Sequence, residues 1–432
     1  MVERKLTEKP DFLALAAENS GFFPGYFESQ SLNEKIGRYD LLFAAPAIEM
    51  VAYNPQQFQQ LLINIDTQPN RHATQRPFAY GWLVYLSYES AYLMEPKLSH
   101  LINQSEEPLA IAVYCQGCLL HDHYRNETRV MAESDVVADQ ILANLRQVTE
   151  FEHHDIQIKK VNEAPGEDFE FAVTKVRELI KEGDIYQANL SRPYTCNTTK
   201  GVTPADVFSN LKQANPAPFA CLLQCNQFAV ISSSPERLLH IGNGMIETRP
   251  IAGTRPRSKN IEQDLALIEE LINTPKERAE HIMLIDLERN DIGKVCEIGS
   301  VEVDELMVIE TYQHVHHIVS NVKGRIKNGV SIMDAIKALF PGGTITGCPK
   351  IRCMEIIHQI ESQNRGAYTG SLGYINHDGQ ADFNILIRTI GMFGDKIKFN
   401  AGAGIVFDSS PQAELAETRH KAKGMLKALT AD

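Results

Sequence analysis

The chain has 432 residues, of which 43% are hydrophobic and 22% are charged, and its formal net charge is -13. This profile is typical of a globular protein with ample length to bury a core. The acidic balance argues against nucleic acid and anionic membranes as partners, since both attract basic surfaces. The N-terminus lacks the apolar segment of a signal peptide, and no apolar run approaches the ~20 residues of a membrane span. We therefore expect a cytoplasmic protein.

Eight cysteines are scattered along the chain, and Cys115 and Cys118 form the only Cys-x-x-Cys pair. A zinc site would need a second pair or suitably spaced histidines, and the sequence has neither. We therefore expect reduced and mostly buried thiols.

The first part of the chain predicts short strands and turns, with strands at 39–45 and 80–88 and a helix over 132–148. The polar segment 150–166 is the best candidate for a linker. It divides the chain into an N-terminal region (1–150) and a second region (166–432), which we expect to pack as one globular unit.

The second region begins with a predicted helix over 167–182, where apolar residues recur at helical spacing and Gly183 suits the position after the helix end. Further helices are predicted at 261–287, 332–339, 350–360 and 412–428. Strands are predicted at 185–194, 219–224, 228–232, 238–241, 314–322, 370–375, 384–391 and 396–405. Runs of strands with helices between them, without regular alternation, indicate an α+β protein with largely antiparallel sheets.

The segment 247–257 combines two prolines and one glycine with three arginines, Arg249, Arg255 and Arg257. Proline fixes φ and glycine permits unusual backbone conformations, so we predict a stiff, exposed loop. Fixed positive charge on such a loop in an acidic protein suggests a small anionic substrate.

Two carboxylate pairs are spaced to lie on one helical face each, Glu277 with Glu280 and Glu414 with Glu417. Four carboxylates from two converging helices would suit Mg²⁺, which prefers oxygen ligands. Such pairs are also common on solvated helices. Lys421 lies one turn after Glu417, where it can neutralise the pair or a substrate carboxylate.

The segment 341–350 is a glycine-rich loop that opens a helix, and Pro349 suits the first helical turn. It lacks the Lys-Ser/Thr of a nucleotide-binding loop. Backbone amides at a helix N-terminus still favour an anion.

Three histidines, His314, His316 and His317, lie on a predicted strand. The alternation of a strand places His314 and His316 on one face and His317 on the other. A His-x-His pattern alone is weak support for a metal site.

Several separated blocks agree in order and spacing with the chorismate-utilising enzymes, the family of anthranilate, aminodeoxychorismate, isochorismate and salicylate synthases. These blocks are Ser234-Pro-Glu236, 247–257, Lys276–His281, 341–350 and Asn400–Val406. The second region therefore resembles a chorismate-binding catalytic region, which implies sandwich-like antiparallel sheets with helices between and around them.

The resemblance also implies roles for individual residues. Glu280 and Glu417 fall on the Mg²⁺ ligands, with Glu277 and Glu414 beside them. Glu236 matches the proposed general acid for departure of the ring C4 hydroxyl, and His317 matches the pocket histidine. Residues expected to contact the substrate are Ala252, Gly253, Thr254, Thr344, Tyr368, Arg388, Gly404 and Lys421.

Two positions discriminate among the activities of the family. Isochorismate and salicylate synthases carry a lysine where this chain has Gln187, and glutamine cannot act as that base. Most aminodeoxychorismate synthases carry a lysine at the position of Ala252, whereas anthranilate synthases read Pro-Ile-Ala-Gly-Thr there, as this chain does. Other segments, such as 186–189 and 315–317, resemble the aminodeoxychorismate side. The balance favours amination of chorismate to 4-amino-4-deoxychorismate, with anthranilate formation as the alternative.

Amination needs ammonia, and no cysteine has the setting of a glutaminase nucleophile. The resemblance therefore implies a separate glutaminase subunit as partner. A metabolite-binding regulator that uses the same pocket is a third, non-enzymatic possibility.

Overall fold

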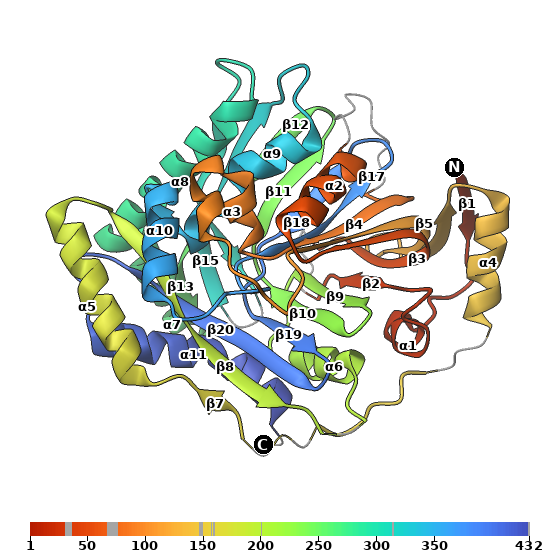
Figure 1. The fold of residues 1–432 in the computed structure, drawn as a ribbon, viewed down its shortest axis with the longest axis horizontal. Helices are drawn as coiled ribbons and strands as arrows, with labels where there is room; N and C mark the ends of the chain where they lie inside the picture. Colours follow the sequence, from red (N-terminus) through yellow and green to blue (C-terminus); the bar gives the residue numbers. More distant parts are fainter. Residues whose placement is uncertain are drawn as a thin grey trace.

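The computed structural model describes residues 1–30, 37–66, 77–146, 150–156, 158, 160–199, 201–312 and 315–430. Its strands pair antiparallel and form one connected network that folds back on itself as two arms (Figure 1). The prediction of an α+β fold with largely antiparallel sheets is confirmed.

In the first arm, β15 pairs with β14 on one edge and with β13 and β12 on the other, and the arm runs on to β4. Its strands are β14 (Glu302–Thr311), β15 (Val315–Arg325), β13 (Ile251–Pro256), β12 (Met245–Thr248), β11 (Arg237–Gly242), β18 (Ala381–Asn384), β17 (Ser371–Asn376) and β4 (Gly81–Leu86). β5 (Ala110–Asp122) pairs with β4 on one edge and with β3 of the second arm on the other. It therefore joins the two arms, and β6 (Glu127–Ala132) and β1 (Val2–Lys5) extend from it.

The second arm runs from β3 to β8. Its strands are β3 (Tyr39–Ala52), β2 (Gly25–Glu28), β9 (Phe219–Cys225), β10 (Phe228–Ser234), β19 (Thr389–Phe393), β20 (Lys396–Ile405) and β8 (Gln187–Asn197). Two short strands, β7 (Asn162–Glu163) and β16 (Gly347–Cys348), also pair with β8. Because β4 pairs with β17 and β2 with β9, the first third of the chain completes both arms.

Buried aromatic and aliphatic side chains from the facing arms meet between them. The rings of Tyr85 and Phe228 lie 5.4 Å apart, and those of Phe43 and Tyr374 lie 6.1 Å apart. These contacts belong to one continuous apolar cluster. The arms therefore pack as a sandwich, as the family resemblance implied.

Helices cover the outer faces of the two arms (Figure 1). One group shares a single apolar cluster: α2 (Pro55–Ile65), α3 (Ser90–Met94), α5 (Gly166–Glu182), α8 (Pro275–Val295), α9 (Ile332–Leu339) and α10 (Lys350–Ile360). Within it, α8 and α9 lie against the first arm, whereas α5 and α10 lie against β8 of the second. A second group shares another cluster: α1 (Phe12–Glu18), α4 (Asp135–Leu145), α6 (Pro204–Ala214) and α11 (Pro411–Leu429). α7 (Ile261–Asn273) precedes α8, and two 3-10 turns, η1 (Pro96–Leu101) and η2 (Gly343–Ile345), complete the described elements.

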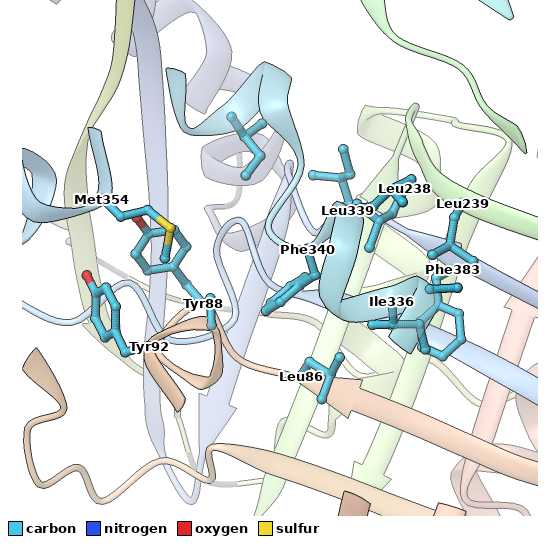
Figure 2. Close-up of a cluster of buried hydrophobic side chains, with 14 of the residues drawn as sticks. Leu86, Tyr88, Tyr92, Leu238, Leu239, Ile336, Leu339, Phe340, Met354 and Phe383 are labelled. Atoms are coloured by element: carbon cyan, nitrogen blue, oxygen red, sulfur yellow. The ribbon is translucent and has the colours of Figure 1, made fainter. Parts of the chain in front are cut away.

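α9 shows how sequence determines this packing. Ser331 caps its first turn in a reciprocal arrangement with Asp334, which satisfies two backbone amides. Its apolar face then lies against β11 and β18, and Figure 2 shows Ile336 and Leu339 directed toward Leu238, Leu239 and Phe383. Burying a side chain of this size typically stabilises a fold by roughly 1.5–3 kcal/mol.

The structure differs from the predicted elements at three places. The helix predicted over 261–287 is two helices, because Pro275 begins a new one after Thr274. The strand predicted over 384–391 is interrupted between β18 and β19. The segment 247–257 is not an exposed loop, since β12 and β13 occupy most of it and pair with β15.

Replacing Gly183 with alanine is expected to destabilise the fold by about 1 kcal/mol. Gly183 ends α5 with φ of 85°, a left-handed conformation in which a Cβ is strained, although the space around it is open. Urea unfolding of both proteins measures the difference. An alanine variant as stable as the parent would show that the helix end relaxes freely.

Candidate active site

The predicted site residues come from many separate elements. Glu236 follows β10, and Ala252, Gly253 and Thr254 lie on β13 opposite His317 of β15. Thr344 lies in η2, Tyr368 and Arg388 lie in the turns before β17 and β19, and Gly404 lies on β20. Glu277 and Glu280 lie on α8, and Glu414, Glu417 and Lys421 lie on α11.

The three arginines of segment 247–257 are not available to an anionic substrate. Arg249 is buried and pairs with Glu305 and Glu310. Arg255 pairs with Glu270 and Glu277, and Arg257 pairs with Asp264. The prediction that these arginines form the anion site is therefore wrong, because they hold α7, α8 and β14 against β13.

Glu236 is the best-placed acid in the cluster. Its side chain is buried, and burial raises the pKa of its carboxyl to about 7. The nearby Thr344 hydroxyl and the charges of Arg388 and Lys421 favour the ionised form, but desolvation outweighs them. Thr344 Oγ1 is itself buried and makes no hydrogen bond of standard geometry. The carboxyl can thus carry a proton near neutral pH.

Arg388 is a partly buried cation next to Glu236. Burial lowers the pKa of its guanidinium, whereas the charge of Glu236 raises it. Among the residues that the structure describes, no ion pair or side-chain hydrogen bond satisfies this guanidinium. Its backbone has φ of 52°, an uncommon conformation for a residue with a side chain. A guanidinium held in this way can accept a carboxylate through two parallel hydrogen bonds.

His317 faces the bulge at Gly253 on the neighbouring strand. Its Nδ1 lies 2.9 Å from Thr254 Oγ1 and 3.4 Å from the carbonyl oxygen of Gly253. Burial, and then the charge of Arg388, lower the pKa of the imidazole to about 4, so the ring is neutral near pH 7. Ala252 is buried on the same strand, and Gly253 has φ of 67°.

His316 points to the other face of β15, as predicted, and contacts Thr311 and Asp264. His314 lies outside the described residues. The prediction that His314 and His316 share one face of the strand therefore stays a prediction.

The carboxylates of α8 and α11 lie close enough for their charges to interact. Burial raises the pKa of Glu280, and the charges of Glu277 and Glu417 raise it further. Burial also raises the pKa of Glu414, to which the charge of Glu417 contributes. Lys421 Nζ lies 2.7 Å from Glu417 Oε1, and both side chains are about half exposed. The mutual repulsion makes this a place where a cation would be favourable.

Small residues on β20 let polar side chains approach its backbone. A Cβ at Gly404 would lie 2.5 Å from Gln187 Nε2 and 3.7 Å from Glu280 Oε1, and the Gln187 amide donates to Glu280 at 3.1 Å. A Cβ at Gly402 would lie 2.5 Å from the Tyr368 hydroxyl. β20 therefore has Gln187 and Glu280 close to Gly404, and the Tyr368 hydroxyl close to Gly402 two residues earlier.

The donor set fits Mg²⁺, although no three His, Cys, Asp or Glu side chains of the described ranges lie close enough to enclose a metal ion. Mg²⁺ is usually held by one or two carboxylates and completes its shell with water and substrate oxygens. Glu280 and Glu417 can supply such carboxylates from α8 and α11.

Two buried residues near the site were not predicted. Glu288 on α8 accepts a hydrogen bond from the Gly343 amide. This amide of the glycine-rich loop is therefore bonded to a side chain of the protein and not to a bound anion. Arg365 pairs with Glu361, donates to the carbonyls of Ile345 and Asn189, and lies 5.6 Å from the Tyr368 ring. A charged residue within an apolar helical stripe, such as Glu288 between Leu284 and Ile292, is the sequence feature that marks the first of them.

All eight cysteines are unpaired in the structure, and seven are buried. The expected burial of the thiols is confirmed.

Among the described residues, no helix has the length and apolar character needed to cross a membrane.

Comparisons with known proteins agree on one family. A sequence profile described as chorismate binding enzyme matches residues 25–427. The anthranilate synthase component I-like protein of Synechocystis is 40% identical over 358 residues, covering 82% of this chain and 73% of its own. Aminodeoxychorismate synthase component 1 of Bacillus subtilis is also 40% identical, over 365 residues, covering 82% of this chain and 77% of its own.

A solved structure supports the same relationship. Anthranilate synthase component I from Streptococcus pneumoniae superposes with a TM-score of 0.80 at 31% identity, covering 91% of this chain and 93% of its own. Relatives named for two different activities are thus about equally similar to this chain in sequence.

Proposed function

Because this chain belongs to the chorismate-binding enzymes, we propose that it is the synthase subunit of an aminodeoxychorismate synthase. Members of the family are enzymes. The proposed reaction aminates chorismate with ammonia, supplied by a glutaminase partner, to give 4-amino-4-deoxychorismate, a precursor of 4-aminobenzoate and folate. The observation that carries the proposal is a buried acid, Glu236, beside the Arg388 guanidinium.

Glu236 would protonate the C4 hydroxyl as it leaves. Hydroxide is a poor leaving group, and a carboxyl that is protonated near neutrality turns it into water. The raised pKa of Glu236 supports this role. Neutral His317 lies near the same pocket without competing for the proton.

Arg388 and Tyr368 would hold the pyruvyl carboxylate of the substrate. An arginine without an internal partner is suited to this, because binding the carboxylate satisfies a charge that folding leaves exposed to the pocket. Thr254, Thr344 and Gly404 would line the rest of the pocket, together with Ala252 and Gly253.

Glu280 and Glu417 would hold Mg²⁺, with Glu277 and Glu414 nearby, and the bound ion would neutralise a carboxylate of the substrate. Lys421 would remain paired with Glu417 and add positive charge on the Glu236 side. The relief of repulsion among the α8 and α11 carboxylates supports the assignment.

Anthranilate formation is the second candidate. Ala252, which cannot form a covalent ring adduct, favours it, and relatives of both names are about equally similar. Ala252 excludes a lysine adduct at this position in either case, which implies direct attack on the ring by ammonia or water in place of an enzyme-bound intermediate.

We expect the isolated chain to use ammonium salt but not glutamine, and to release 4-amino-4-deoxychorismate. The purified protein is incubated with chorismate, Mg²⁺ and ammonium salt, and the product is identified by chromatography with and without an aminodeoxychorismate lyase. Formation of 4-aminobenzoate only with the lyase supports the proposal. Fluorescent anthranilate with equimolar pyruvate, formed without lyase, would establish the second candidate.

Glutamine replaces ammonium in a parallel reaction, with and without a glutaminase subunit. Product from glutamine and the pure chain alone would contradict the expected partner. Chorismate binding without turnover under any nitrogen source would favour a metabolite-binding regulator.

A further inference from the structure

Arg365 is a buried arginine that the sequence motifs did not identify as part of the site. It lies in the turn 365–370, between α10 and β17, and 2% of its surface is exposed. Its guanidinium makes five hydrogen bonds, as many as it has N–H groups. A charge at this depth is costly unless it is paired and hydrogen-bonded, so the position of each partner matters.

Two of these bonds fix the guanidinium to Glu361, the residue that follows α10. Nε and Nη2 donate to the two carboxylate oxygens of Glu361 at 2.9 and 2.7 Å. β8 holds Glu361 in turn, because the Ser191 amide donates to the same carboxylate at 2.8 Å. A bidentate pair of this kind leaves the guanidinium little freedom to rotate. It therefore presents its remaining N–H groups in fixed directions.

Two further bonds reach elements around the candidate site. Nη1 donates to the carbonyl of Ile345, the residue after Thr344 in η2, at 3.2 Å. Nη2 donates to the carbonyl of Asn189 on β8 at 2.7 Å. The Asn189 amide in turn donates to the carbonyl of Thr346 at 2.9 Å. The η2 segment and β8 are thus bound to one another and to the same guanidinium.

The fifth bond reaches the turn that carries Tyr368. Nη1 donates to Thr369 Oγ1 at 3.3 Å, and the Tyr368 amide donates to the Arg365 carbonyl at 3.2 Å. Thr369 has φ of 61°, a strained conformation for a β-branched residue that persists only where its surroundings hold it. The guanidinium also lies 5.6 Å from the centre of the Tyr368 ring. Arg365 thus acts on both the backbone and the ring of Tyr368.

We propose that Arg365 is a positioning residue of the candidate site, which fixes η2 and Tyr368 relative to one another and thereby sets the affinity for chorismate. All its N–H groups are used within the protein, so it makes no contact with the substrate itself. The inference rests on the proposed function, in which Tyr368 contacts the substrate carboxylate.

The test is a double-mutant cycle on chorismate affinity between Arg365→Lys and Tyr368→Phe. Lysine keeps the charge, but its ammonium group does not span the acceptors that a planar guanidinium reaches. We expect Arg365→Lys to weaken chorismate binding on the order of tenfold, because it misplaces groups that contact the substrate. Tyr368→Phe should weaken binding roughly tenfold through loss of a hydrogen bond to a carboxylate. Calorimetric titration without a nitrogen source measures each Kd.

Non-additivity is the result that distinguishes positioning from a merely structural role. If Arg365 acts through Tyr368, loss of the Tyr368 hydroxyl should matter little once position 365 is altered. The double variant should then bind chorismate at least about threefold more tightly than the product of the two single effects predicts. Independent effects would multiply to roughly a hundredfold loss, and that result would overturn the proposal.

Arg192→Lys is the matched control. Arg192 on β8 is also 2% exposed, pairs with Glu163 and donates to the carbonyl of Ala164. Among the described contacts, its guanidinium meets no residue of the candidate site. The lysine variant should lower the melting temperature, but Tyr368→Phe should still cost roughly tenfold in this background. Coupling as strong as that of Arg365 would overturn the proposal.

A second cycle applies if Arg365→Lys does not fold. Thr369→Val removes the hydroxyl that accepts from Nη1, but it keeps the β-branched shape and leaves the Arg365–Glu361 ion pair in place. It should weaken chorismate binding by at least about threefold and show the same coupling with Tyr368→Phe. Additive effects in this cycle would likewise overturn the proposal.

The product assay distinguishes a failure of this inference from a failure of the proposed function. Additive effects in a protein that makes 4-amino-4-deoxychorismate would overturn the positioning role alone. A protein that shows the expected coupling but releases anthranilate would overturn the proposed product alone. A parent protein that does not bind chorismate would overturn both.

Discussion

Replacing Glu236 with glutamine is expected to lower turnover by about 10²–10⁴-fold, while chorismate binding changes little. A proton donor acts mainly in the transition state, where charge develops on the leaving oxygen. Glutamine has nearly the same shape as a protonated glutamate, so the pocket should keep its form. Steady-state kinetics measure kcat, and calorimetric titration of chorismate measures binding.

The same residue predicts a pH dependence. Burial raises the pKa of Glu236 to about 7, and the acid must be protonated to act. Activity should therefore be present below pH 7 and decline as the pH rises through this value. A Glu236→Gln variant that binds chorismate much more weakly but turns over normally at saturation would make Glu236 a binding residue only.

Removing either proposed metal ligand, by Glu280→Gln or Glu417→Gln, is expected to abolish activity without unfolding the protein. The carboxylates of α8 and α11 repel one another, so loss of one charge should not destabilise the protein without metal. A bound cation would offset this repulsion in the parent protein and so stabilise it. Mg²⁺ should therefore raise the melting temperature of the parent and have a much smaller effect on either variant.

Asp286→Asn provides the control for the metal prediction. Asp286 lies on α8 with an exposed side chain that pairs only with Arg289 across one helical turn among the described contacts. This variant should retain both activity and the response to Mg²⁺. Undiminished turnover of the parent in excess chelator would remove the metal site from the proposal.

Elements with local sequence determinants were predicted closely. α9 and α10 begin and end at the predicted residues, and α5 ends where Gly183 adopts its left-handed conformation. In each case a cap, a breaking residue or an apolar stripe within a few positions defines the element. No distant contact is needed to place it.

Features that depend on distant partners were missed. The segment 247–257 contains prolines and a glycine, yet β15 supplies pairing and β14 supplies Glu305 and Glu310 to neutralise Arg249. In the break between β18 and β19, backbone groups bond to a distant segment: the Ile385 amide donates to the carbonyl of Glu236, and the Ser233 amide donates to that of Arg388. Tertiary context overrides local propensity in such places, and a single sequence does not reveal the partner.

The candidate site residues were identified through motifs, and the structure brings several of them close together; their roles stay predictions. The charges of Arg388 and Lys421 act on the Glu236 carboxyl, and Glu280 lies beside Gly404. Glu288 was missed because the Glu288–Gly343 contact joins residues 55 positions apart.

The pairing of β4 with β17 and of β2 with β9 has a consequence for handling the protein. A fragment that begins at the polar segment 150–166 would expose two unsatisfied strand edges, each ready to pair with another chain. Such a fragment should aggregate although it contains every proposed catalytic residue. Supplying residues 1–150 as a separate chain should restore solubility, since those strands would occupy both edges.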